Sequence, residues 1–345
     1  AMLVFFGFLF ANAQRGRVQA EGQIEVKSLN DRLEDLSQGS AHSLLDPAAQ
    51  KVALKVEKKR KKAEQKSAKK AAKQAAKQTA SNQEGEEDSE ATKEDSYCFV
   101  LSFEGDLQAS AVENLREEVT AVLMVAKEGD EVVVKLESPG GVVHGYGLAA
   151  SQLRRIRDRG LKLTVAVDMV AASGGYMMAC VADKIVASPF AVLGSIGVIT
   201  EQPNVYERLK REGVEFSTVT AGKYKRTLTL FGENTDKGRQ KFQEELEETH
   251  ELFKAFVHEN RPALDVAAVA TGEIWYGRRA LEAGLVDELS TSDALLTSLA
   301  AERDLLAVRF VQRRNWQDRL GVAAEETVTR AILRLWQRGL DRRQV

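Results

Sequence analysis

From residue 97 onward, short apolar runs alternate with segments long enough to be helices, and this alternation constrains the fold more than any other feature. The runs are four to six residues long and rich in Val, Ile and Leu. Strands separated by helices are typical of a parallel sheet whose faces the helices cover. We therefore predict an α/β fold. The expected strands are 98–103, 131–136, 163–167, 184–187 and 214–219, and the expected helices are 112–126, 148–156, 173–182, 204–211 and 240–257.

The cysteine and histidine content argues against several kinds of site. The chain has 345 residues, of which 43% are hydrophobic, two are Cys and four are His. The two cysteines, Cys98 and Cys180, cannot build a disulfide scaffold. The sequence also contains no CxxC, no Cys/His cluster and no HExxH, which are the usual patterns of zinc sites. We therefore expect neither a metal nor a cofactor.

The net charge of −2 conceals two blocks of opposite sign. Residues 51–77 carry twelve Lys and Arg against two Glu, and residues 84–95 carry seven Asp and Glu against one Lys. Such segments bury too little apolar surface to offset the entropy of ordering, so we interpret 14–96 as a charged linker. The alternatives for the basic block are contact with anionic lipid and, less favoured, with nucleic acid. We expect no nucleic-acid partner.

The two ends of the chain have their own patterns. Residues 1–11 are apolar throughout, but this run is shorter than the roughly 20 residues that a membrane span needs. They are either the end of an N-terminal membrane anchor, 1–13, or the tail of a cleaved signal peptide. Aromatic density and the arginines that follow favour the anchor, which makes membrane lipid an expected partner. The C-terminal tail, 311–345, is amphipathic and either packs on protein or lies on a membrane surface.

Two loops after expected strands offer catalytic chemistry. The turn Ser-Pro-Gly-Gly ends in Gly140 and Gly141, where backbone N–H groups can approach an oxyanion closely. The alternative is an ordinary turn. Ser173, in Ala-Ala-Ser-Gly-Gly-Tyr, opens an expected helix and is either a nucleophile or a plain helix N-cap. Its small apolar surroundings predict a substrate pocket for small or medium apolar side chains, lined by Val170, Ala171, Ala172 and Met177.

A nucleophilic serine needs a general base, and the sequence offers two kinds. His144 is the only histidine near the first two loops, just after the glycine turn. Lys223 and Lys225 follow the expected strand 214–219, and a desolvated lysine can lose its proton and act as a base. The residues alone leave this choice open.

Five motifs occur together and in order: SPGG, AASGGY, LGSIGV, GKYKRTLTLFGEN and TGEIWYGRRALEAGLVDE. Their order and spacing resemble the signal peptide peptidase A family of Ser–Lys peptidases, over roughly residues 97–310. The resemblance implies a ClpP/crotonase-like fold, in which ββα-type units repeat along a largely parallel sheet covered by helices. It also implies endopeptidase activity through an acyl-enzyme, with 97–310 as the peptidase domain.

The resemblance assigns roles to individual residues. It implies that Ser173 is the nucleophile, that Lys225 is the general base, and that Ser195 orients the lysine amine. Gly140 or Gly141, together with the N–H of Gly174, would form the oxyanion hole. We expect Lys225 to be buried, because burial favours a neutral amine.

The resemblance further implies an assembly, a location and substrates. Family members of this length build their active sites between the subunits of a ring, so a homo-oligomer of about eight subunits is expected. The expected location is the bacterial inner membrane, with one N-terminal span and the side of the catalytic domain open. The expected substrates are peptides or proteins with extended apolar segments, such as signal-peptide remnants or misfolded chains. The alternatives are a crotonase-like acyl-CoA enzyme and a non-enzymatic membrane scaffold.

Overall fold

The computed structural model describes residues 22–43 and 96–312. The expected anchor, both charge blocks and all but the first two residues of the expected tail lie outside these ranges. The chain divides into two units, of which the larger is Val26–Val308. Within the ranges that are described, we find no helix with the length and apolar character of a membrane span.

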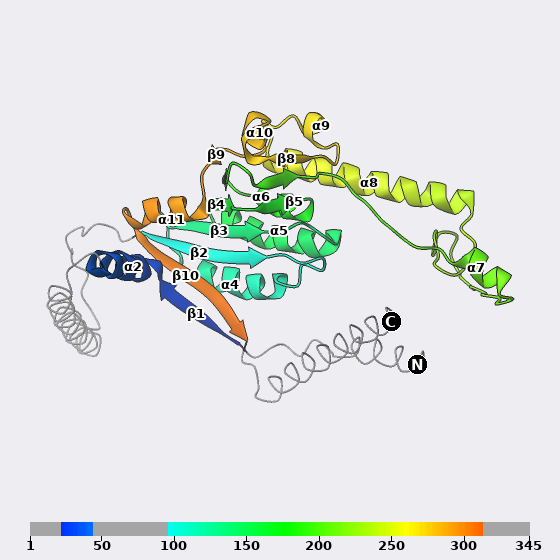
Figure 1. Cartoon of the computed structure of the whole chain (residues 1–345), viewed down its shortest axis with the longest axis horizontal. Coiled ribbons are helices and arrows are strands. Elements are labelled where there is room, and N and C mark those ends of the chain that lie inside the picture. The colour runs from blue at the N-terminus through cyan, green and yellow to red at the C-terminus, as the bar shows by residue number, and fades with distance from the viewer. Residues whose placement is uncertain (1–21, 44–95, 313–345) are drawn as a thin grey trace, which may run out of the picture. The chain divides into compact units, whose positions relative to one another are not determined.

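The main sheet has seven strands in the order β1-β10-β2-β3-β4-β6-β9 (Figure 1). From β10 to β9 in this order, every two neighbouring strands are parallel. The three consecutive valines of β3, Val132 to Val134, are fully buried, as expected for a parallel strand covered on both faces. The strands are β1 (Gly22–Ser28), β2 (Tyr97–Glu104), β3 (Glu131–Glu137), β4 (Lys162–Val167), β6 (Lys184–Ala187), β9 (Glu288–Leu289) and β10 (Asp304–Gln312).

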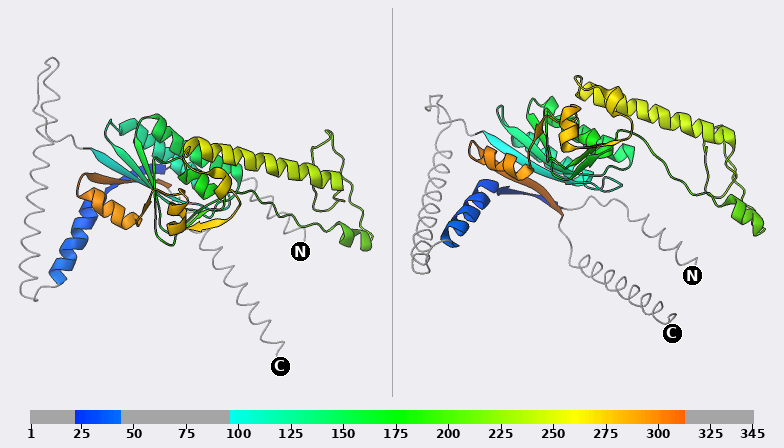
Figure 2. Two further views of the ribbon diagram at one scale, coloured as in Figure 1. Left: turned by 90° about the horizontal axis from the view of Figure 1, so that it is seen from above. Right: turned by 45° about the horizontal axis from the view of Figure 1, so that its top comes forward.

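Helices pack on the sheet and on one another (Figures 1 and 2). The helices α4 and α5 contact each other and the sheet, and α5 also contacts α6. Elsewhere, Leu296 of α11 and Leu29 of α2 join a core cluster with Cys98 and Leu305. The helices are α2 (Leu29–Ser43), α4 (Val112–Val125), α5 (Val143–Asp158), α6 (Gly174–Ala179), α7 (Tyr206–Arg211), α8 (Asp236–Asn260), α9 (Val266–Val269), α10 (Gly277–Glu282) and α11 (Ser292–Ala300).

A second, three-stranded sheet has the order β5-β7-β8 and consists of β5 (Val170–Ala172), β7 (Val192–Gly194) and β8 (Ile274–Tyr276). The chain passes from β4 directly into β5 and then α6, and from β6 into β7. After β3 it makes a single parallel bridge, Ser138 to Ala171, before entering α5. A strand of the main sheet, a strand of the small sheet and a helix thus repeat as a ββα unit. The expected α/β class with a largely parallel sheet is confirmed.

Two sequence-based predictions about secondary structure are wrong. Residues 214–219 form no strand: Val214, Phe216 and Val219 are exposed, and no strand of the described ranges pairs with this segment. The interpretation of 14–96 as linker fails for 22–43, which form β1 and α2. The charge blocks lie downstream of these residues, and Leu29 is drawn into the core by apolar packing.

Candidate active site

Ser173 lies at a sharp turn between β5 and α6. Its backbone has φ 52° and ψ −118°, a region that side-chain-bearing residues rarely occupy and that costs roughly 1–3 kcal/mol. The Ser173 N–H donates to the Gly194 carbonyl at 2.7 Å, and the Ser173 carbonyl accepts the Met177 N–H at 2.9 Å. These two bonds hold the turn between β7 and the first turn of α6.

The structure does not support the alternative interpretation of Ser173 as a helix N-cap. Ser173 occupies the N-cap position of α6, yet its side chain makes no capping hydrogen bond. With only six residues, α6 has too few aligned peptide dipoles to explain by itself the stabilisation of an oxyanion at Ser173. What remains is a partly exposed hydroxyl beside the N–H of Gly174.

The glycine turn lies against Ser173. Gly140 has φ 89°, and a Cβ built on it would come within 2.7 Å of the Ser173 Cβ and 2.8 Å of the Gly174 nitrogen. Only glycine permits this approach. The Gly140 N–H donates to the Ser138 hydroxyl at 3.1 Å. Gly141 and Gly174 line a cavity together with Ser173.

Ser195 is the second serine in a left-handed conformation, with φ 50°. Its N–H donates to the Glu273 carbonyl at 2.7 Å, which links the end of β7 to the start of β8. A cavity of about 1090 Å³ is lined by both Ser173 and Ser195. The structure therefore brings these two predicted residues to one space.

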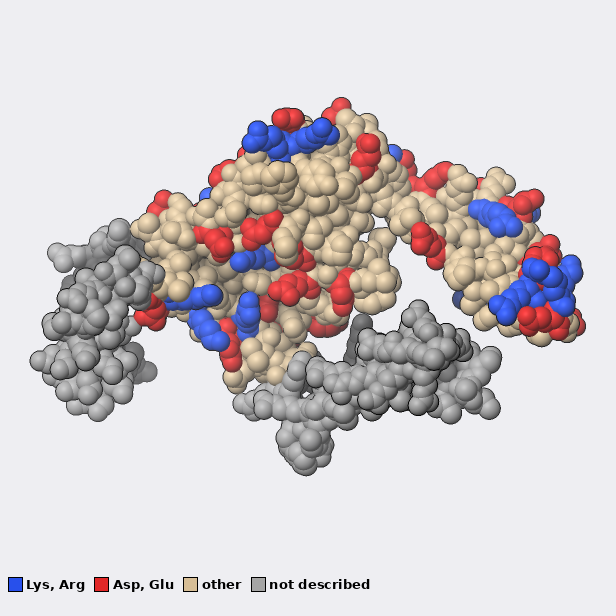
Figure 3. Space-filling view, viewed as in Figure 1, with Lys and Arg blue, Asp and Glu red and all other residues tan. Residues whose placement is uncertain are grey.

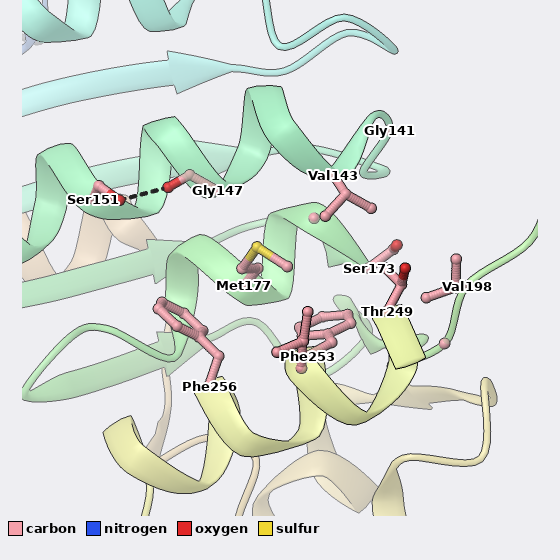
Figure 4. A pocket seen from close by; sticks show the side chains of 13 residues that line it. Gly141, Val143, Gly147, Ser151, Ser173, Met177, Val198, Thr249, Phe253 and Phe256 are labelled. Atoms are coloured by element: carbon pink, nitrogen blue, oxygen red, sulfur yellow. Dashed lines mark hydrogen bonds between the residues drawn. The ribbon is translucent and has the colours of Figure 1, made fainter. Parts of the chain in front are cut away.

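A smaller cavity of about 410 Å³ opens beside Ser173 (Figure 4). Three helices line it: Gly147 and Ser151 lie on α5, Met177 on α6, and Phe253 on α8. The full lining is mostly apolar and comprises Gly141, Val143, Gly147, Ser151, Ser173, Gly174, Met177, Gly197, Val198, Thr249, Leu252, Phe253 and Phe256.

Of the four residues that we predicted to line the substrate pocket, only Met177 borders this cavity. Val170, Ala171 and Ala172 form β5 and pair with β7, and both alanines are buried. The walls come instead from α5 and α8. The sequence of α8 has an apolar stripe that contains Phe253 and Phe256, but such a stripe does not distinguish a packing face from the wall of a cavity.

Lys225 lies in the segment that connects α7 to α8, and its side chain is exposed, contrary to our expectation. The two cavities that border Ser173 do not include it. The adjacent Tyr224 ring lies 5.5 Å from the ammonium of Lys241 on α8. Lys241 precedes the cavity residue Thr249 by eight residues, about 12 Å of helix. One copy of the chain therefore leaves Lys225 away from Ser173.

The arm formed by α7, its flanking segments and the first half of α8 extends away from the sheets (Figures 1 and 2). Charged side chains of both signs gather over the end of the arm that carries α7 (Figure 3). Several apolar side chains of the arm face solvent: Ile199, Val214, Phe216, Val219, Tyr224 and Phe231.

The histidine alternative gains little from the geometry. His144 and His250 both line the larger cavity. The Nε2 of His250 lies 3.2 Å from the Ile196 carbonyl oxygen. In the described part of the chain, neither imidazole hydrogen-bonds a carboxylate that could orient it as a general base.

Comparisons with known proteins place these features in a family. The model described as "Peptidase family S49" matches residues 155–306, and "Peptidase family S49 N-terminal" matches residues 1–153. A Haemophilus influenzae protein named "Probable protease SohB" is 56% identical over 236 residues, covering 68% of this chain and 67% of that protein. One of the same name from Buchnera aphidicola is 51% identical over 238 residues, covering 69% and 71%.

Among solved structures, a "1510-N membrane-bound stomatin-specific protease" bound to a substrate peptide matches with a TM-score of 0.37 and 12% identity. That match covers 59% of this chain and 80% of the other. The sequence matches suffice: the chain belongs to peptidase family S49 and is a serine peptidase similar to SohB.

Proposed function

We propose that this chain is an endopeptidase with Ser173 as the nucleophile and Lys225 as the general base. One observation carries the proposal for Ser173. Its hydroxyl lies in a strained turn, makes no capping bond and borders an apolar cavity between three helices. Strained backbone of this kind is often found where a reactive side chain has to be presented precisely.

The chemistry follows from these groups. The Ser173 hydroxyl attacks the peptide carbonyl as its proton passes to the neutral Lys225 amine. The tetrahedral intermediate breaks its C–N bond, and the lysine ammonium gives that proton to the leaving amine. Water then attacks the acyl ester, with Lys225 taking a proton from the water and returning it to the Ser173 oxygen.

The backbone N–H groups of Gly141 and Gly174 are the proposed donors to the oxyanion. Both residues line the cavity beside Ser173. The Gly140 N–H is occupied by the Ser138 hydroxyl, so it is the less suitable donor of the two turn glycines. Gly140 instead supplies the close approach that lets the turn lie against Ser173.

Lys225 is proposed to act on the Ser173 of a neighbouring copy in a homo-oligomer. Two observations support this: the amine is exposed and outside the cavities of its own chain, and the arm that carries it exposes apolar side chains such as Val219, which is 95% exposed. Exposed apolar groups in such number are typical of an interaction surface. Docking against a second copy would bury them together with Lys225. A ring of about eight subunits is the assembly that we propose.

Because the cavity is apolar, we propose that the substrates are extended, largely apolar segments, such as signal-peptide remnants or misfolded chains. Its volume of about 410 Å³ accommodates one side chain of medium or large size. We further propose that residues 1–13 belong to a membrane anchor and that the enzyme acts at the bacterial inner membrane.

The experiment combines active-site labelling with subunit mixing. The wild type is expected to cleave apolar peptides and to be labelled by a fluorophosphonate at Ser173. Ser173→Ala and Lys225→Ala should each be inactive, and Lys223→Ala, changed in the same loop, should retain activity. Mixed and reassembled in equal amounts, the two inactive variants should recover about a quarter of wild-type activity, because random assembly restores that share of interfaces.

The results separate the parts of the proposal. Full activity of Ser173→Ala or Lys225→Ala would refute the assignment of that residue. A mixture that stays inactive while subunits exchange would place both residues in one chain. A wild type that is not labelled and is inert towards peptides would favour the acyl-CoA enzyme or the scaffold.

A further inference from the structure

We propose that Ser138 and Tyr146 are positioning residues that hold the two halves of the oxyanion hole together. The inference rests on the proposed function, because it concerns the N–H groups of Gly141 and Gly174. Neither Ser138 nor Tyr146 touches the substrate on this proposal. Both are completely buried.

A chain of hydrogen bonds runs from the glycine turn through both side chains. The Gly140 N–H donates to the Ser138 hydroxyl at 3.1 Å, and that hydroxyl donates to the Tyr146 hydroxyl at 2.6 Å. The Tyr146 hydroxyl donates in turn to the Asp106 carbonyl at 2.8 Å. Because a carbonyl can only accept, the direction of every bond in the chain is fixed. The turn therefore has one preferred position relative to Tyr146.

The ring of the same tyrosine lies against the other half of the hole. A Cβ on Gly174 would come within 2.3 Å of the Tyr146 Cγ, so the ring rests directly on the Gly174 backbone. Phe103 supports the ring from the side, with centroids 6.4 Å apart and planes at 69°. The hydroxyl of Tyr146 thus fixes the glycine turn, and its ring fixes Gly174, the residue after the proposed nucleophile.

The main chain of Ser138 adds a further connection. Its N–H donates to the Val170 carbonyl at 2.8 Å, and its carbonyl accepts the Ala172 N–H at 3.0 Å. Ser138 is therefore tied to β5, the strand directly before Ser173, and its hydroxyl adds the link to Tyr146. Burial raises the pKa of the Tyr146 hydroxyl, although the bond from Ser138 works against this, so the group stays protonated and continues to donate.

The catalytic consequence concerns the transition state more than substrate binding. Oxyanion donors act because they are aimed in advance at the place where charge develops. Without the hydroxyl of Tyr146 or of Ser138, the turn loses its fixed position, and the Gly141 N–H is held less precisely. Substrate binding in the cavity between α5, α6 and α8 uses other contacts and should change little.

The test compares Tyr146→Phe and Ser138→Ala with the matched control Tyr176→Phe. Tyr176 is also completely buried, and its hydroxyl donates to a backbone carbonyl, that of Leu285, at 2.9 Å. We expect Tyr146→Phe to lower kcat roughly 10- to 100-fold, less than the roughly 100- to 1000-fold loss on removing a donor outright. KM should change little, and a peptide aldehyde should bind more weakly in parallel with kcat. Combining Tyr146→Phe with Ser138→Ala should add little, because both break the same chain.

Amide hydrogen exchange provides a readout that does not depend on catalysis. Tyr146→Phe should speed exchange in residues 138–142, and Tyr176→Phe of similar thermal stability should not. Unchanged exchange in that segment, or a loss of activity no larger than that of Tyr176→Phe, would overturn the inference. If Tyr146→Phe does not fold, Ser138→Ala decides by the same two measurements. Failure of the wild type to be labelled at Ser173 would instead count against the proposed function.

Discussion

Replacing Gly147 by alanine should stabilise the protein and at the same time narrow its substrate range. Gly147 lies inside α5, and a Cβ built on it would meet no atom within 4 Å. Glycine inside a helix is less favourable than alanine by roughly 0.5–1 kcal/mol, so Gly147→Ala should gain about that much. For a domain of this size the gain corresponds to an increase in Tm of roughly 1–4 °C.

The new methyl group would project into the cavity beside Ser173, since Gly147 lines it (Figure 4). In an apolar pocket, one methylene changes discrimination by about 1–3 kcal/mol, or roughly 10- to 200-fold. We therefore expect kcat/KM to fall about tenfold or more for peptides with Phe before the cleaved bond and to stay nearly constant for peptides with Ala there.

The assay measures thermal unfolding and kcat/KM over peptides that differ only in that residue, from Ala through Val and Leu to Phe. Gly145→Ala is the matched control on the same helix. Its Cβ would come within 2.9 Å of the Gln108 carbonyl oxygen, and Gly145 does not line the cavity. The control should lose stability without a change in selectivity. A Gly147→Ala variant that is destabilised would refute the helix argument, and an equal loss over the whole peptide series would refute the cavity argument.

Gly140→Ala should abolish peptidase activity, because its Cβ would lie 2.7 Å from the Ser173 Cβ in a left-handed backbone; turnover close to wild type would contradict this. Burial raises the pKa of Cys98 and of Cys180 to about 12, so neither thiol of the folded protein should react with iodoacetamide at pH 8, whereas both should react in urea. Burial of the Asp287 carboxyl raises its pKa, but the paired Arg261 and the Ile185 N–H lower it more, so the net pKa lies below its usual value. The pair then stabilises the fold above about pH 4 and loses this effect as the pH falls further, so urea unfolding should show Arg261→Gln less stable at pH 7, with a smaller difference from wild type as the pH falls below 4.

Much of the fold could be predicted because the strands of the sheet centre are marked by their own residues. Val132 to Val134 are buried on both faces of a parallel sheet, and only a run without polar interruption satisfies that position. The predicted strand 163–167 likewise begins within one residue of β4, and four of its five residues are apolar. The sequence also singles out Ser173 and the glycine turn, and the structure brings Ser173 and Gly141 to one cavity.

The parts that could not be predicted depend on contacts distant in the sequence. Residues 214–219 alternate like a strand, but a strand also needs a neighbour, which the isolated sequence cannot show. The cavity beside Ser173 is walled by Phe253, some eighty residues further along the chain. An apolar stripe on α8 looks the same whether it fills a core or borders an opening. Tyr146 was missed because a buried tyrosine has no local pattern that marks its partners.

The different surroundings of Ser173 and Lys225 have a chemical consequence for the proposed enzyme. Ser173 is fixed by its own chain, whereas Lys225 is on an exposed arm. An ammonium group cannot accept a proton, and removal from water is what favours the neutral amine. Docking of the arm on a neighbouring copy would bring the amine to the Ser173 hydroxyl and desolvate it in the same step. An unassembled chain would therefore have a nucleophile without a base, and its peptidase activity should appear only with assembly.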